Sequence, residues 1–434
     1  MRTASENPLD VDAVERQTAP VSIRESLFVL KDRDFGWFFA SRFVNLAGSS
    51  MSHVALAFAV LEVTDSASAL GYVVAAHTIP MVVFLLVGGV IADRFPRRLV
   101  LQLSNVASAL TQAAAAALVI TGHAEIWHLV VLQAMNGTTM AMAFPAMQGM
   151  VPQLVAKKDL QPANLLLSMS RGTLTVLGPS VAAALVVGVG AGWALAVDAL
   201  TWLLAALFLL PVRIPPRPAD EEKTSALEDL RAGWTYFRST TWLWVVVVAF
   251  MVLNAIQSGG LNVLGPAYAK SSSLGVEGWG LANSALAAGM LIMTIVLMRA
   301  TIRRPLRAGM FGIMAFSLPF FALALWPETL PLIVAMAVAG AGIEIFSLGW
   351  SLAMQENVPG EMLSRAYSYD ALGSFLAMPV GQLLYGPLAG WFGERPVFLV
   401  SGVLYAAVCL AALSVPSVVR LQRVEQPATE GTRV

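Results

Sequence analysis

Twelve apolar runs of membrane-spanning length dominate the 434-residue sequence. A bilayer core needs about 20 consecutive apolar residues per helix. The runs occupy approximately residues 35–62, 70–92, 99–121, 125–149, 165–189, 192–212, 241–265, 278–299, 306–326, 330–354, 366–390 and 395–416. Only 12% of the residues are charged, whereas a soluble domain carries about 25%. The sequence therefore predicts an all-α integral membrane protein with twelve transmembrane helices.

The longest connection between the runs separates six of them from the other six. The predicted parts are an N-terminal tail, a first six-helix bundle, a linker, a second six-helix bundle and a C-terminal tail, at residues 1–34, 35–212, 213–240, 241–416 and 417–434. Within the linker, a capping-box pattern at Ser225 and Glu228 is followed by apolar residues at helical spacing, including Trp234 and Phe237. This pattern predicts a short amphipathic helix on the membrane surface.

The basic residues are distributed unevenly between alternate connections. With the N-terminus in the cytoplasm, Lys270 and Arg395 are the only ones of 27 that fall in outer connections, and Arg42 and Arg171 fall within runs. The positive-inside rule therefore predicts that both termini are cytoplasmic. The single cysteine, Cys409, cannot form an internal disulfide. No catalytic constellation is recognisable, so we expect neither an enzyme nor a bound metal or cofactor.

The two halves of the sequence resemble each other. Residues 146–152 match residues 353–359 at an offset of 207, and Gly178-Pro179 matches Gly386-Pro387 at an offset of 208. A duplication of six helices predicts a pseudo-two-fold axis along the membrane normal, with a binding site between the halves near mid-membrane.

A short loop between the second and third runs has the sequence Gly89-Val-Ile-Ala-Asp-Arg-Phe-Pro-Arg-Arg98. It resembles the Gly-x-x-x-Asp-Arg-x-x-Arg-Arg signature of the major facilitator superfamily. The resemblance extends over roughly residues 30–418. Residues 42–71 and 198–202 are similar to the bacterial exporter branch that includes the enterobactin exporter and macrolide-efflux proteins. This resemblance implies transport by alternating access, in a bacterial inner membrane.

The resemblance also implies a gate at the inner ends of the helices. Its expected members are Gly89, Asp93, Arg94, Arg97, Arg98 and Asp370. An acid at this position can meet an arginine or a positive helix N-terminus, and Asp370 is expected to pair with Arg97 or Arg98. The alternative is that the arginines serve only as anchors on the positive side of the membrane.

Ionisable residues within spans are costly and usually face a cavity. Glu344 in the tenth run and Arg42 in the first are therefore the candidates for proton coupling. A structural hydrogen bond between helices is an equal alternative for Glu344. Asp198, in the sixth run, is expected to make a structural bond near the outer surface.

Helices that line the cavity by resemblance supply the candidate substrate-binding residues. These are Asn45, His53, Gln133, Asn136, Asn254, Gln257 and Trp350. Helix–helix packing is the alternative role, and about half of the set is expected to have it. The superfamily's exporters often carry an arginine at the position that Gln133 occupies here, so weight shifts to Glu344 or Arg42.

The sequence favours a monomeric exporter of a small, largely apolar molecule, driven by exchange for protons and needing no cofactor or nucleic acid. Two alternatives stay open. One is an uptake carrier of the same fold, which would need a denser polar site. The other is a membrane receptor or assembly factor that does not transport, which would have no need of an intact gate at Asp93.

Overall fold

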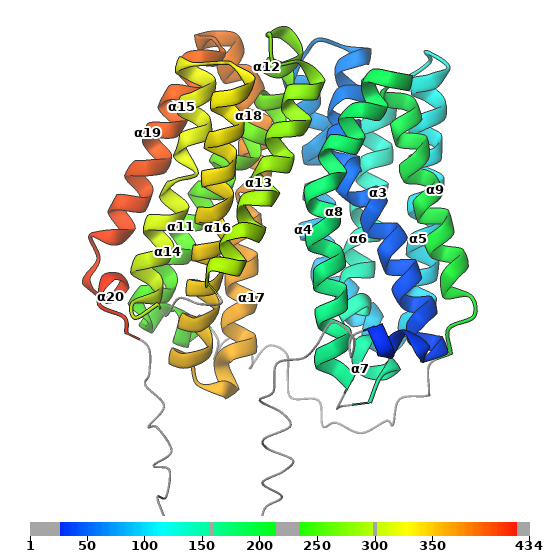
Figure 1. Cartoon of the computed structure of the whole chain (residues 1–434), viewed down its shortest axis with the longest axis horizontal. Coiled ribbons are helices and arrows are strands. Elements are labelled where there is room, and N and C mark those ends of the chain that lie inside the picture. The colour runs from blue at the N-terminus through cyan, green and yellow to red at the C-terminus, as the bar shows by residue number, and fades with distance from the viewer. Residues whose placement is uncertain (1–26, 149, 157–158, 214–233, 298–301, 423–434) are drawn as a thin grey trace, which may run out of the picture.

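The computed structural model describes residues 27–148, 150–156, 159–213, 234–297 and 302–422 (Figure 1). This part of the chain contains helices and no strands. Ten of its helices are long and apolar enough to cross a membrane by length and composition. The all-α membrane class is therefore confirmed.

The first bundle begins with a short 3₁₀ helix, η1, and continues through six long helices and one short one. Asp32 accepts hydrogen bonds from the backbone N–H groups of Asp34 and Phe35 and so caps the first long helix. Gly190, with φ of 94°, makes the turn between the last two helices. The elements are η1 (Val29–Lys31), α3 (Arg33–Val63), α4 (Ala67–Arg94), α5 (Arg97–Ile120), α6 (Ile126–Gln148), α7 (Val151–Leu154), α8 (Leu160–Val189) and α9 (Ala191–Leu209).

The second bundle repeats the arrangement with more interruptions. Its elements are α11 (Thr241–Gly259), η3 (Gly260–Leu264), α12 (Gly265–Ser271), α13 (Gly275–Leu297), α14 (Pro305–Met314), α15 (Ser317–Leu325), α16 (Thr329–Asn357), α17 (Gly360–Leu376), α18 (Met378–Phe392), α19 (Glu394–Leu413) and α20 (Pro416–Val419). The π-helical turn η3 joins α11 to α12 in one span, and α14 with α15 forms another. If α17 and α18 are also counted as one span, the arrangement agrees with the twelve predicted helices.

The two bundles stand side by side (Figure 1), and two pairs of helices make the most extensive contacts between them. Helix α4 packs against α18, and α8 packs against α13. At the sequence offset of 207–208, α4 corresponds to α13 and α8 corresponds to the span of α17 and α18. The two contacts are therefore equivalent under the duplication, as a pseudo-two-fold axis requires.

The two ends of the bundles differ. The end that carries η1, α7 and α20 is called the tail end below, and the opposite end, with the α3–α4 and α12–α13 connections, is called the far end (Figure 1). The described part of the predicted linker helix lies at the tail end. There the rings of Trp234 and Phe237 pack against Tyr369 of α17, with centroids 5.7 and 5.5 Å away. The start of this predicted helix lies outside the described residues.

Close packing of α3 against α9 organises the first bundle. A Cβ atom on Gly48 would overlap the Thr201 hydroxyl and crowd the Asp198 carboxyl. Ser41, two turns away on the same face of α3, donates to the carbonyl oxygen of Ala205 at 2.8 Å. Small residues at such a seam allow helix backbones to approach within the membrane. The seam places the Asp198 side chain between α3 and α5.

Candidate transport site

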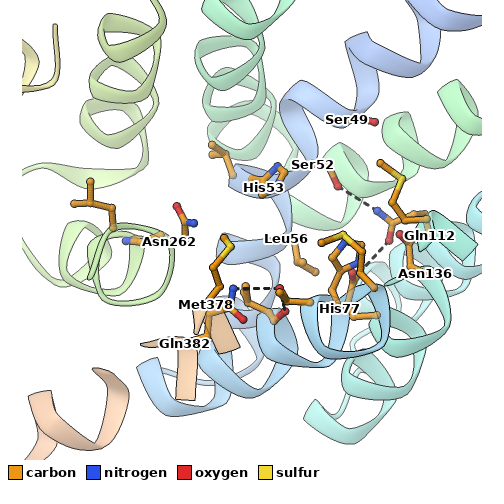
Figure 2. A pocket seen from close by; sticks show the side chains of 18 of the residues that line it. Ser49, Ser52, His53, Leu56, His77, Gln112, Asn136, Asn262, Met378 and Gln382 are labelled. Carbon is orange, nitrogen blue, oxygen red and sulfur yellow. Dashed lines mark hydrogen bonds between the residues drawn. The ribbon is translucent and has the colours of Figure 1, made fainter. Parts of the chain in front are cut away.

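A cavity of about 270 Å³ lies between the two bundles (Figure 2). Helices α3, α4, α5, α6 and α9 line one side, and η3, α12, α13, α17 and α18 line the other. Half of the lining side chains are apolar, including Trp202, Trp279 and Phe375. The polar half consists of Ser49, Ser52, His53, His77, Thr78, Gln112, Gln133, Asn136, Asn262, Asn283 and Gln382. The cavity therefore offers aromatic surfaces together with many neutral hydrogen-bonding groups.

Three of the seven predicted substrate residues line this cavity: His53, Gln133 and Asn136. The other four are not among its lining residues and are engaged or placed elsewhere. Asn45 accepts a hydrogen bond from Arg42 at 3.0 Å, and Asn254 donates to the carbonyl oxygen of Ser374 at 3.1 Å. Trp350 donates to the carboxylate of Asp370 at 3.0 Å. Gln257 is partly buried on α11. Helical spacing defines the faces of a helix, but the rotation of each helix within its bundle depends on packing.

A hydrogen-bonded network of side chains lies behind the cavity wall of the first bundle. Gln112 of α5 donates to the Asp198 carboxylate at 2.5 Å and to the Ser52 hydroxyl at 3.2 Å. It accepts from Gln133 at 3.2 Å. Asn136 is linked to the neighbouring Thr111 at 3.4 Å. Through this network a buried carboxyl group is connected to the cavity.

Gln382 connects the two bundles at the cavity. Its amide nitrogen donates to the Thr78 hydroxyl of α4 at 3.1 Å and to the Ser258 hydroxyl of α11 at 2.7 Å. The side chain is 2% exposed. A Cβ atom on Gly71 would overlap its carbonyl oxygen, so α4 and α18 lie close together here. Nothing in the sequence distinguished Gln382, because its role depends on a partner 304 residues away.

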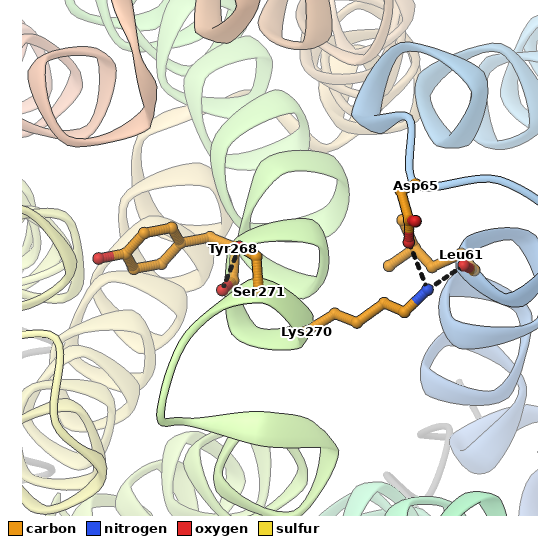
Figure 3. Close-up of polar contacts among 5 residues, drawn as sticks. All are labelled: Leu61, Asp65, Tyr268, Lys270 and Ser271. Atoms are coloured by element: carbon orange, nitrogen blue, oxygen red, sulfur yellow. Dashed lines mark hydrogen bonds and ion pairs between the residues drawn. The ribbon is translucent and has the colours of Figure 1, made fainter.

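Polar contacts join the bundles at the far end (Figure 3). The ammonium group of Lys270, at the end of α12, lies 2.7 Å from an Asp65 carboxylate oxygen and donates to the carbonyl oxygen of Leu61. Deeper between the bundles, Ser180 of α8 and Ser284 of α13 share a hydrogen bond of 2.8 Å. These contacts therefore join the two bundles at and below the far end.

The predicted gate lies at the tail end and is described only in part. Arg98 donates to the carbonyl oxygen of Leu209 at 3.1 Å and to that of Leu210, so it caps the end of α9. Asp370 accepts from Trp350, as given above, and Arg97 begins α5. The side chains of Gly89, Asp93 and Arg94 lie outside the described residues.

Neither of the two predicted proton-coupling residues is among those that line this cavity. Glu344 is partly exposed on α16 and is not among the residues that line the cavity. Arg42 lies on α3 toward the tail end, where it bonds to Asn45. Asp198 makes the interhelical bond that the sequence predicted, since it is 1% exposed and bonded to Gln112 of the cavity wall. The prediction treated α9 as a peripheral helix and could not foresee the partner on α5.

Three bacterial membrane proteins are similar in sequence to this chain over most of their length. The uncharacterized MFS-type transporter YfiS of Bacillus subtilis is 25% identical over 82% of this chain and 87% of its own length. Macrolide efflux protein A of Streptococcus pyogenes is 22% identical over 86% and 93% of the two chains. The enterobactin exporter EntS of Escherichia coli is 22% identical over 91% and 94%.

Solved structures agree with the fold. The nucleoside transporter NupG superposes with a TM-score of 0.71 at 14% identity, over 88% of this chain and 98% of that one. An inward-facing bacterial homologue of the iron transporter ferroportin gives 0.66 at 18% identity, over 88% and 99%. The family model of the Major Facilitator Superfamily matches residues 38–381. With its two six-helix bundles and the cavity between them, the chain belongs to the Major Facilitator Superfamily of transporters.

Proposed function

We propose that the protein exports a small amphipathic molecule from the cytoplasm by alternating access, in exchange for protons. The observation that carries this proposal is the cavity between two bundles that polar contacts join at the far end and beside the cavity. Such an arrangement fits a state that admits a ligand from the tail end. Full-length relatives named as exporters of a macrolide and of enterobactin support the direction.

The proposed orientation places the tail end in the cytoplasm of a bacterial inner membrane. Arg303 and Arg304 connect α13 to α14 at the tail end, and Arg33 begins α3 there. Lys270 and Arg395 are the only lysine or arginine residues that the sequence places at the far end. This asymmetry supports cytoplasmic termini under the positive-inside rule. The protein would act as a monomer without a cofactor.

The cavity supports a ligand with both aromatic or apolar surface and hydrogen-bonding groups. Half of the residues that line it are polar, but the surface that they and their neighbours present to the cavity is mostly apolar, which suits a largely apolar ligand. Ligand sites of this kind combine apolar walls with a few polar groups that fix orientation. The polar residues within this lining are what supports the second candidate, uptake of a polar nutrient, and the structural likeness to a nucleoside transporter extends to the fold alone.

Inverted membrane vesicles that contain the protein distinguish the two candidates. The panel consists of a macrolide, enterobactin and a nucleoside, with the vesicle lumen made acidic by respiration. Export in exchange for protons predicts that a member of the panel accumulates in the lumen and that a protonophore abolishes the accumulation. Accumulation of the nucleoside in right-side-out vesicles alone would instead establish uptake. Empty vesicles and vesicles with Asp93→Asn provide the controls.

The coupling group is part of the same proposal. Glu344 and Arg42 are the candidates that the sequence provides, and Glu344→Gln should uncouple efflux from the proton gradient if Glu344 carries the proton. Efflux by Glu344→Gln that keeps its full dependence on pH would assign coupling to another group.

A further inference from the structure

We infer that Asp198 is a reversible proton-binding group whose protonation state is transmitted to the cavity through Gln112. This inference rests on the proposed exchange for protons and names the residue that would carry them. Its basis is the burial of the carboxyl group, its short hydrogen bond from Gln112 and its connection through Gln112 to the cavity wall.

The two carboxyl oxygens of Asp198 have different surroundings. Oδ2 accepts from the Gln112 amide nitrogen at 2.5 Å. Ser52 and Trp202 lie beside the carboxyl group, but Oδ1 is buried and has no hydrogen bond of normal geometry among the described residues. A buried polar atom without a partner is costly. One oxygen is therefore free to carry a proton without breaking an existing bond.

The helices around Asp198 carry few charged or titratable groups. It lies on α9, which packs against α3, α5 and α8. On these helices such groups are Arg33, Asp34, Arg42, His53 and Glu62 of α3, Arg97 and Arg98 of α5, and Arg171 of α8. The described bonds of Arg42, Glu62 and Arg98 go to Asn45, the Ala191 N–H and the end of α9. None of these bonds supplies a cation to Asp198.

Opposing effects act on this carboxyl group. Removal from water without a cation disfavours the ionised form, whereas the N–H group of Gln112 stabilises it. A group that must take up and release a proton during each transport cycle needs such a balance, because a strong ion pair or an entirely apolar site would hold it in one form.

The connection through Gln112 explains how the cavity could respond. With Asp198 ionised, the Gln112 nitrogen points to the carboxylate, and its oxygen accepts from Gln133. Protonation at Oδ1 turns Oδ2 from a carboxylate oxygen into a carbonyl oxygen, which still accepts from Gln112 but more weakly. The Gln112 amide and its bond to Gln133 would then be held less firmly, and both side chains line the cavity (Figure 2 shows Gln112). A bound ligand would therefore experience a different wall in each protonation state.

Infrared difference spectroscopy of the full-length protein in liposomes tests this inference without a ligand. Spectra recorded across a pH series should contain the carbonyl stretch of a protonated carboxyl group that disappears reversibly as the pH rises. The band should be absent from Asp198→Asn and retained in Glu344→Gln. In Gln112→Met, which removes the donor, the midpoint should move up by about one to two pH units, since a hydrogen bond to a charged group is worth about 1.5–3 kcal/mol.

The outcomes separate this inference from the export proposal. A titrating band that persists in Asp198→Asn, or a midpoint that Gln112→Met leaves unchanged, overturns the inference whatever the vesicle experiment shows. If Asp198→Asn does not fold, as judged by size-exclusion chromatography, the Gln112→Met titration decides alone. Absence of transport in vesicles bears on the export proposal and leaves the proton-binding measurement intact.

Discussion

The contact between Lys270 and the first bundle should determine how often the far end opens. Lys270 bonds to both the Asp65 carboxylate and the Leu61 carbonyl oxygen (Figure 3). The Asp65 side chain is 88% exposed and that of Lys270 is 35% exposed. An exposed ion pair contributes only about 0.2–1 kcal/mol. Asp65→Asn should therefore favour the open far end by no more than roughly fivefold.

Replacement of the lysine should have a larger effect than replacement of the aspartate. Lys270→Met loses the ion pair and also the charge-assisted bond to the Leu61 carbonyl oxygen. A hydrogen bond to a charged group contributes about 1.5–3 kcal/mol. A net change of about 2 kcal/mol in the free energy between closed and open far ends corresponds to roughly 30-fold in population. Arg395 provides a matched control, because it lies at the same end but bonds at 3.3 Å to Tyr268 of its own bundle.

Distances between spin labels at the far end measure these populations. Labels at His123→Cys and Ser273→Cys, in a Cys409→Ala background, report on the exposed α5–α6 and α12–α13 connections of the two bundles. The population with the longer distance between the two labels should be smallest in the wild type, larger in Asp65→Asn and largest in Lys270→Met. In Arg395→Gln it should equal that of the wild type. The reasoning is refuted if Asp65→Asn opens the far end as much as the lysine variant, or if neither opens it.

Three further substitutions test other parts of the molecule. Asp93→Asn should lower transport by roughly tenfold or more while membrane insertion, measured by fluorescence of a fused reporter, stays normal; unchanged transport would remove Asp93 from the gate. Gly71→Ala should hinder closure of the far end, because the added Cβ overlaps the Gln382 carbonyl oxygen, and the label distance should lengthen; a wild-type distance would show that α4 and α18 can separate at little cost. Glu344→Gln should keep the pH dependence of efflux if Asp198 is the proton site, and a loss of that dependence would restore Glu344 as the coupling group.

The sequence alone was sufficient for the architecture. Local composition is enough to recognise the twelve apolar runs, the alternation of basic connections and the loop at residues 89–98. The reason is that a bilayer requires a minimum apolar length for each spanning helix and favours positive charge on one side. The offset of 207 residues anticipated a pseudo-two-fold relation between the halves, and the equivalent contacts of α4 with α18 and α8 with α13 agree with it. These features need no knowledge of which side chains meet.

Only the tertiary structure determined which polar residues form the site. His53, Gln133 and Asn136 line the cavity whereas Asn254 does not, because the rotation of each helix is set by contacts with its neighbours. Gln382 has its partners 304 and 124 residues away. Such distant pairs leave no local pattern, since a side chain's function in a bundle depends on what the opposite helix presents.

Asp198 shows most clearly which information came from the sequence and which from the tertiary structure. The sequence places a carboxyl group within an apolar run, where it is costly and calls for a partner. Its partner, Gln112, lies 86 residues away and occupies an ordinary polar position of the third run. Close packing of α9 against α5, with α3 drawn in at Gly48, brings the two together behind the cavity wall. Local sequence thus determined that Asp198 needed a partner, and helix packing determined that the partner connects it to the cavity.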